Sequence, residues 1–282
     1  MVNWSTSYGA AQRVGGLREA GRLMTEAEGQ GLLHVTDARL LADIGNLVGP
    51  VEAAMLYGSH ARGSANKHSD VDVLAVVKTN PRSLTADALT VTAYRASHLR
   101  ALAARGSLFV LHLVRDGRVL YDPSGVLSGV MADYQPPTNP ALLGEELSVA
   151  ARGLQAATAH ERAVHGPAMT KLGYYLIRTA AYDRCARKGT PEFDSRIALA
   201  NLGYSKLVPC IESRRDPYTD EMLSTVMDAL SVIFPDGGCS GPPGLAAAAV
   251  AAAFQRPLAS DLLSAVLCDD SIDYTALTLP PA

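Results

Sequence analysis

The chain has 282 residues, which is enough for one large domain or two smaller ones that each bury a core. Hydrophobic residues make up 48%, charged residues 19%, and the net charge is −3, so the basic excess typical of proteins that bind bulk nucleic acid is absent. The four cysteines form no Cys-x-x-Cys pair, which disfavours a zinc site or a disulfide framework. No signal peptide and no apolar stretch of membrane-spanning length is visible, so a cytoplasmic protein with no membrane partner is predicted.

The first half of the chain is predicted to alternate helices and strands. A short helix is expected within residues 17–28, and an apolar stripe at helical spacing predicts another over residues 32–47. Two apolar runs, residues 51–57 and 71–77, predict buried strands.

Three more elements are predicted before the middle of the chain. Residues 97–105 are expected to form a helix, and the apolar run over residues 108–114 predicts a strand. Asp116-Gly117 predicts a tight turn into another strand over residues 119–121. The first half is therefore expected to build a small mixed sheet with helices around it.

The composition changes at residues 134–140, where prolines indicate a linker. Beyond it only helices are predicted, punctuated by Gly166-Pro167 and Gly189-Thr190-Pro191. Their expected ranges are residues 142–165, 168–188, 196–202, 221–234 and 260–267. The predicted fold is an α/β (α+β) domain with a small mixed sheet and an N-terminal helical extension over residues 1–135, followed by an all-helical domain over residues 141–282.

Two carboxylates mark the start of the second predicted strand. Asp70 and Asp72 are separated by one residue, so their side chains point to the same face, while Val71 and Val73 point to the other. Two like charges at the start of an apolar strand are energetically unfavourable unless a cation compensates them. Carboxylate oxygens suit Mg²⁺, which prefers to be shared with substrate phosphates. The pair therefore predicts a Mg²⁺ site for metal-assisted displacement at phosphorus.

A Gly-Ser pair follows the first predicted strand. Gly58 lets the backbone approach a phosphate closely, and the Ser59 hydroxyl with the amides that open a short helix can hold its oxygens. Asp-x-Asp and Gly-Ser are each common, but their combination is more specific. Here an apolar strand, Gly58-Ser59 and ten further residues precede Asp70-Val71-Asp72 at the start of a second apolar strand.

This combination resembles the minimal nucleotidyltransferase branch of the DNA polymerase β-like superfamily. The likeness rests on Tyr57-Gly58-Ser59-His60-Ala61-Arg62-Gly63 and Ser69-Asp70-Val71-Asp72-Val73, and it covers roughly residues 51–122. It implies that Gly58 and Ser59 bind the triphosphate of an NTP and that Asp70 and Asp72 coordinate Mg²⁺. Arg62 and Ser69, within the same motif, are also expected to bind nucleotide. The helical half is similar in a general way to helical domains that accompany such enzymes, including antibiotic nucleotidyltransferases.

The sequence departs from this family in one respect. The superfamily usually places a third acidic residue on a neighbouring strand, where it completes the metal site or deprotonates the acceptor hydroxyl. The matching strand is predicted over residues 108–114, whose only ionisable residue is His112. Two interpretations stay open: His112 is a catalytic general base, or it is a core histidine bonded to the backbone.

Other polar residues also have two interpretations. Lys171, Tyr174 and Arg178 recur at helical spacing and share one helix face. That face could stack a base and hold a triphosphate, or it could belong to an amphipathic helix that packs its tyrosines and extends its cations into solvent. Arg62 could reach a phosphate oxygen or brace its loop through a carboxylate. Arg214-Arg215 is expected to lie in a solvated loop.

The leading hypothesis is an enzyme that transfers a nucleoside monophosphate from ATP or another NTP to an acceptor hydroxyl and releases pyrophosphate. The acceptor is left open between a small molecule such as an aminoglycoside, a protein and a tRNA end, and so is the choice between monomer and homo-oligomer. The alternative is a catalytically inactive, nucleotide-binding regulatory or toxin–antitoxin interaction module. The missing third acid favours that alternative, and the intact pair Asp70 and Asp72 disfavours it.

Overall fold

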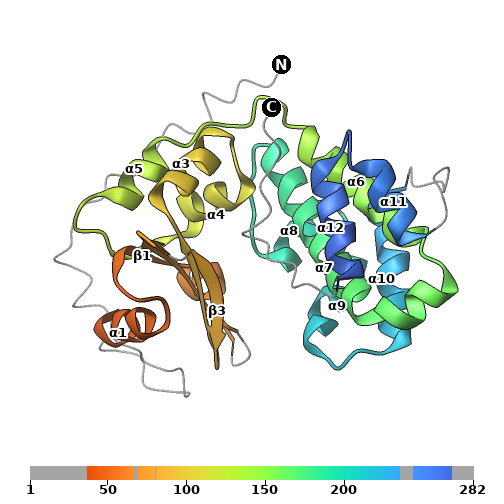
Figure 1. The fold of residues 1–282 in the computed structure, drawn as a ribbon, viewed down its shortest axis with the longest axis horizontal. Helices are drawn as coiled ribbons and strands as arrows, with labels where there is room; N and C mark the ends of the chain where they lie inside the picture. The colour runs from red at the N-terminus through yellow and green to blue at the C-terminus, as the bar shows by residue number, and fades with distance from the viewer. Residues whose placement is uncertain (1–36, 67–68, 80, 236–243, 269–282) are drawn as a thin grey trace.

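The computed structural model describes residues 37–66, 69–79, 81–235 and 244–268. The described chain forms a mixed sheet with helices on both faces, followed by a region built of helices, and Figure 1 shows the two parts side by side. Residues 133–141 connect them. The predicted fold class, a small mixed sheet followed by helices, is confirmed. The helix expected within residues 17–28 lies outside the described residues.

The sheet has five described strands in the order β3-β4-β2-β1-β5. Their bounds are β1 Val51–Tyr57, β2 Val71–Val77, β3 Arg82–Ala86, β4 Leu89–Tyr94 and β5 Arg118–Tyr121. The central strands β1 and β2 match their predicted ranges, and each is buried and apolar over its last five residues because helices cover both faces of the sheet. β2 and β4 run parallel, and the other neighbours are antiparallel.

Sequence reasoning missed the hairpin formed by β3 and β4. Its turn contains Asp87, which has a positive φ of 50°. The alternation Leu89-Thr90-Val91-Thr92-Ala93 was the available signal, because apolar and polar residues alternate where one strand face is solvated. The threonines of that alternation face the site described below.

A layer of apolar side chains covers each face of the sheet. One face packs on α1 (Asp37–Val48), whose Ile44 lies against Val73 and Ala75. The other face packs on α3 (Ala96–Ala104), α4 (Leu108–Asp116) and α5 (Val126–Ala132). Met55 and Leu74 belong to this second layer, so alternate residues of β1 and β2 face opposite layers.

The prediction of a strand over residues 108–114 is wrong, because this run lies within helix α4. The helix is buried on two sides: Phe109 and Leu113 pack on the sheet, whereas Leu111 packs on the helical region. A helix covered on both sides has no long polar stripe, so its sequence reads like a buried strand. The predicted turn at Asp116-Gly117 is therefore the end of a helix, although β5 follows as expected.

The helical region is arranged around one long helix, α7 (Ala159–Arg187), which packs on α6, α8, α10 and α12. The other helices are α6 Leu142–Gln155, α8 Ser195–Asn201, α9 Val208–Glu212, α10 Asp220–Ile233, α11 Leu245–Ala252 and α12 Pro257–Leu267. Short 3-10 turns cover Ser205–Leu207 and Ser213–Arg215. None of the described helices combines the length and apolar character needed to cross a bilayer.

Helix α7 begins earlier than predicted. The Thr158 side chain accepts a bond from the amide of Glu161 at 3.2 Å, and the Glu161 carboxylate accepts one from the amide of Thr158 at 2.8 Å. This capping box satisfies two amides at the helix start. Gly166-Pro167 was expected to separate two helices, but Pro167 lies inside α7, since one proline removes a single backbone bond.

The contact of α7 with α10 depends on a glycine. A Cβ at Gly173 would overlap the side chain of Val226, whereas one at Gly129 in α5 would meet nothing within 4 Å. We expect Gly173→Ala to lower the free energy of unfolding by about 1–3 kcal/mol through overpacking, and Gly129→Ala to raise it by about 0.5–1 kcal/mol. Urea unfolding measures both changes. Equal effects of the two substitutions would contradict the described packing.

Candidate functional site

A cleft of about 740 Å³ lies between the sheet and the helical region. The ends of β1 and β2, the short helix α2 (Gly58–Arg62) and two threonines of β4 line one wall. The C-terminal half of α7 and the segments around α8 and α9 line the other. The cleft therefore draws residues from both halves of the chain.

The two predicted carboxylates lie together on the sheet side of this cleft. Asp72 is paired with Tyr57 of β1, on the same face of the sheet as Leu74, and Asp70 precedes the strand. Burial, and then the neighbouring charge of Asp70, raise the pKa of Asp72 to about 6 from its usual 3.8. Two neighbouring carboxylates, one partly buried and one exposed, form a site that favours a cation.

Gly58 brings the backbone against this pair. Its φ is +73°, and a Cβ there would lie 2.7 Å from Oδ2 of Asp72. A glycine is therefore needed for both the backbone conformation and the space beside the carboxylate. Ser59 follows directly and lines the same cleft, as do Ser69 and Asp70.

Threonines occupy the neighbouring strand where a third acid was sought. Strand β4 runs parallel to β2 with Thr90 opposite Asp72, and both Thr90 and Thr92 line the cleft. Sequence reasoning looked for this position in residues 108–114 because it took that helix for the neighbouring strand. The described residues contain no group of three His, Cys, Asp or Glu side chains that could hold a metal ion.

His112 lines the cleft from helix α4, but its surroundings do not suit a general base. Its side chain is 9% exposed, and its ring stacks on Phe193 with centroids 4.4 Å apart. Nε2 lies 3.2 Å from Nη1 of Arg62 and must accept that bond, since a guanidinium only donates. Burial, and then the charge of Arg62, lower the pKa of His112 to about 3. So weak a base is a poor proton acceptor at neutral pH.

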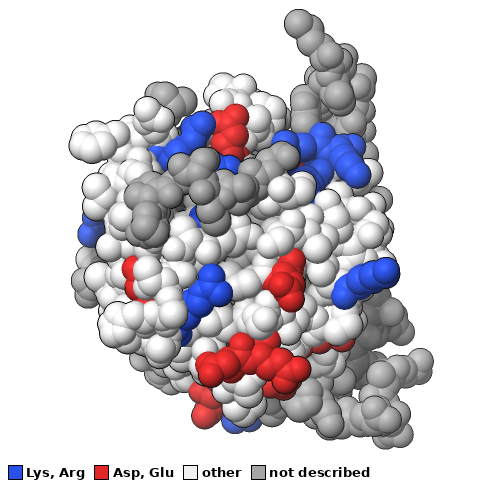
Figure 2. Space-filling view, turned by 90° about the vertical axis from the view of Figure 1, so that its right-hand side faces the viewer, with Lys and Arg blue, Asp and Glu red and all other residues white. Residues whose placement is uncertain are grey.

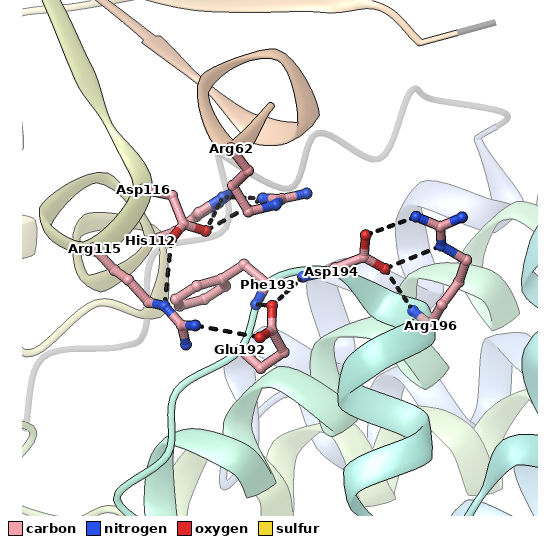
Figure 3. Close-up of polar contacts among 8 residues, drawn as sticks. All are labelled: Arg62, His112, Arg115, Asp116, Glu192, Phe193, Asp194 and Arg196. Carbon is pink, nitrogen blue, oxygen red and sulfur yellow. Dashed lines mark hydrogen bonds and ion pairs between the residues drawn. The ribbon is translucent and has the colours of Figure 1, made fainter. Parts of the chain in front are cut away.

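Figure 3 shows Arg62 held between His112 and the carboxylate of Asp116. The bond from Nη1 of Arg62 to Oδ2 of Asp116 is 3.3 Å long. Arg115 contacts the same carboxylate and also Glu192, at 3.3 and 3.2 Å, which ties the network to the helical region. In this structure Arg62 therefore braces its loop through a carboxylate, as one of the two interpretations held.

The residues predicted to share one face of α7 do not all lie at the cleft. Arg178 lines the cleft together with Tyr182, one turn further on. Lys171 is exposed and lies outside the cleft lining, and Tyr174 is buried with its hydroxyl 3.1 Å from Oγ of Ser213. A helix advances about 1.5 Å per residue, so residues 171 and 178 lie about 10 Å apart along its axis. The prediction that Lys171 and Tyr174 bind nucleotide beside Arg178 is therefore not supported.

Sequence reasoning missed two arginines at the cleft. Arg214 and Arg215 were expected in a solvated loop, but both line the cleft from the turn after α9. Nη2 of Arg215 lies 2.8 Å from Oδ2 of Asp70. Burial, followed by the charges of Arg178 and Arg215, lowers the pKa of Arg214. No spacing rule links residues so distant in sequence, because their contact arises from the packing of two separate parts of the chain.

Comparison with known proteins identifies the sheet part. Residues 42–124 match the family model described as "Polymerase beta, Nucleotidyltransferase", so this part of the chain is a nucleotidyltransferase domain of the polymerase β type. Among solved structures, a nucleotidyltransferase-like protein from Exiguobacterium sibiricum 255-15 is similar, with 13% sequence identity and a TM-score of 0.30. That similarity covers 71% of this chain and 74% of the other. No curated protein matches the chain.

The close approach of Gly58 to Asp72 can be tested with a matched pair. Gly58 and Gly63 have φ values of +73° and +71°, but a Cβ at Gly63 would meet nothing within 4 Å. We expect Gly58→Ala and Gly63→Ala to lose similar stability, about 1–2 kcal/mol each, because both force an L-residue into the left-handed region. Only Gly58→Ala should turn the Asp72 carboxylate and weaken Mn²⁺ binding, measured by calorimetry. Equal Mn²⁺ affinities in the two variants would contradict this.

The neutral, buried state of His112 predicts a pH dependence of stability. The pKa is about 3 in the folded protein and 6.5 in the unfolded chain, so between these values only the unfolded chain binds the proton. The stabilisation is complete above pH 6.5 and is lost as the pH falls towards 3, by at most about 1.4 kcal/mol per pH unit. His112→Gln lacks this contribution. The difference in free energy of unfolding between this variant and wild type, measured with urea, should therefore change steadily between pH 7 and pH 4. A constant difference would contradict the neutral, buried state of His112.

Proposed function

We propose that the protein is a metal-dependent nucleotidyltransferase, which transfers a nucleoside monophosphate from an NTP to an acceptor hydroxyl and releases pyrophosphate. The observation that carries this proposal is the arrangement of Asp70 and Asp72 beside Gly58-Ser59 on one wall of a cleft whose other wall presents arginines. The family match of residues 42–124 supports it, since that family acts on nucleotides.

The carboxylate pair fits a divalent cation. Two hard oxygen donors, one of them with a pKa raised by burial and by its neighbour, favour Mg²⁺, which binds proteins through few carboxylates and keeps positions for water and phosphate. When bound, Mg²⁺ would neutralise charge on the phosphoryl group that is transferred. Asp70 and Asp72 are the residues that would hold it.

Four further residues of the cleft, Gly58, Ser59, Arg178 and Arg214, bind and orient the nucleotide. The Ser59 hydroxyl donates to a phosphate oxygen, and Gly58 leaves room for the phosphate chain beside the strand end. Arg178 and Arg214 on the opposite wall place positive charge over the triphosphate, and charge-assisted bonds of this kind hold the phosphates in line for displacement. Arg62, braced by its own network, adds a guanidinium at the edge of the cleft.

The distribution of charge on the protein surface helps to choose between the candidate acceptors. Figure 2 shows that the outer face of the helical region carries separate groups of acidic and basic side chains on a largely uncharged surface. A tRNA end would need a broad basic surface, which this face does not provide. Together with the net charge of −3, this makes a small molecule such as an aminoglycoside, or a protein hydroxyl, the acceptor that we propose.

One observation favours a second candidate function. Thr90 and Thr92 stand on the strand where the superfamily usually carries its third acid, and a threonine hydroxyl neither deprotonates an acceptor nor replaces a carboxylate ligand. A protein that binds NTP without transferring it, as a regulatory module, would tolerate this exchange. Turnover of NTP separates the two functions.

The decisive experiment is label transfer. Each α-phosphate-labelled NTP is incubated with the protein, Mg²⁺ and either a cell extract or an aminoglycoside panel. We expect label in a product only with wild type, and a loss of at least about a hundredfold in Asp70→Asn and Asp72→Asn, because each removes charge that holds the metal. Binding of NTP by wild type without transfer to any acceptor would instead support the regulatory module.

Asp72→Asn should lose transfer without losing stability. The pKa of Asp72 is higher in the folded protein, about 6, than the usual 3.8, so folding disfavours the ionised carboxylate. Above pH 6 the variant should therefore melt at a higher temperature than wild type without metal, and the gain should disappear below pH 4. Thermal melts at pH 7.5 and pH 3.5 measure this. A lower melting temperature at pH 7.5 would make the variant an unsuitable control.

A further inference from the structure

An ion pair crosses the cleft at the carboxylate that the metal would use. Nη2 of Arg215 lies 2.8 Å from Oδ2 of Asp70, and the two residues are 145 positions apart in the sequence. The Asp70 side chain is 52% exposed and that of Arg215 is 37% exposed. Exposed ion pairs contribute little to stability, so this contact is easily exchanged.

The guanidinium and a metal ion compete for the same oxygen atoms. A divalent cation bound to Asp70 would meet the positive charge of Arg215 at short range, and the two cations would repel each other. Metal binding to Asp70 therefore requires Arg215 to move away or to gain an anion that offsets its charge. In the absence of an anion, Arg215 weakens metal binding.

Other positive groups surround Arg215. Arg178 and Arg214 line the same wall, as do the carboxylates of Glu212 and Asp216. Burial, and then the charges of Arg178 and Arg215, lower the pKa of Arg214. The guanidinium groups of these arginines repel one another, and a bound polyanion would reduce that repulsion. A bound triphosphate would place anionic oxygens between this wall and the carboxylates, within reach of a side chain that already spans the cleft.

We propose that Arg215 is a positioning residue that exchanges Asp70 for the phosphates of the nucleotide, so that metal and nucleotide each strengthen the binding of the other. The inference rests on the proposed function, because it needs both ligands to occupy this cleft. Before ligands bind, Arg215 neutralises Asp70, which directly precedes β2. When the nucleotide gives Arg215 a new partner, Asp70 becomes available, and by linkage the metal favours the nucleotide to the same degree.

Arg215→Gln tests the exchange because it should change two affinities in opposite directions. Without nucleotide, the variant should bind Mn²⁺ about two- to fivefold more tightly than wild type, the effect of removing an exposed ion-pair competitor. With metal present, it should bind a non-hydrolysable α,β-methylene NTP about tenfold more weakly, since a charged phosphate contact is lost. Calorimetry measures both constants. A merely structural role for Arg215 would weaken both.

Arg196→Gln is the matched control. Arg196 lines the same wall, but its Nη2 atom is bonded to Asp194 at 3.0 Å, so its removal should leave the Mn²⁺ affinity unchanged. Arg215→Lys should restore part of the wild-type pattern, because it keeps the charge.

Three outcomes are distinguished. Opposite shifts in Arg215→Gln alone support the exchange. Equal Mn²⁺ affinities in wild type and Arg215→Gln overturn it and leave the proposed enzyme intact. Absence of Mn²⁺ binding in both proteins, with and without nucleotide, overturns the exchange and also removes the metal from the proposed function.

Discussion

The structure around the cleft depends on the repulsion between two carboxylates at the end of one strand. Asp72 is drawn into the sheet by its pairing with Tyr57, and Asp70 follows it because alternate strand residues share a face. Burial, and then the charge of Asp70, raise the pKa of Asp72, so the ionised pair is unfavourable without a compensating positive charge. The pair lies beside Gly58, where a Cβ would come within 2.7 Å of the Asp72 carboxylate, so the backbone at this point is also closely constrained.

Compensation for this repulsion comes from the other half of the chain. The sheet part supplies Asp70, Asp72 and Ser59, whereas Arg178, Arg214 and Arg215 come from the helical region. Both walls carry charges of both signs, since Arg62 lies on the sheet wall and Glu212 and Asp216 lie on the helical wall. The cleft therefore belongs to neither part alone, although the family match covers only the sheet part.

The sequence was sufficient to predict the features that depend on local pattern. Strands β1 and β2, the Gly-Ser turn and the carboxylate pair are contiguous signals, and their placement at one cleft agrees with the residues expected there. Helix α4 was misassigned because burial on two sides hides helical periodicity, and that error moved the search for a third acid away from Thr90. The contact of Arg215 with Asp70 had no sequence signal, since it exists only when the two parts are packed together.

The stack of Phe193 on His112 has a mechanical consequence. Phe193 lies in the segment between α7 and α8, while His112 accepts the bond that orients Arg62. Phe193 also contacts the ring of Tyr182 on α7, with centroids 5.3 Å apart, so three aromatic rings join α4 to the helical region. Any change in the separation of the two parts would therefore have to part these rings, whereas Arg62 would keep its bonds to His112 and Asp116, which lie in the same part of the chain as Arg62 itself.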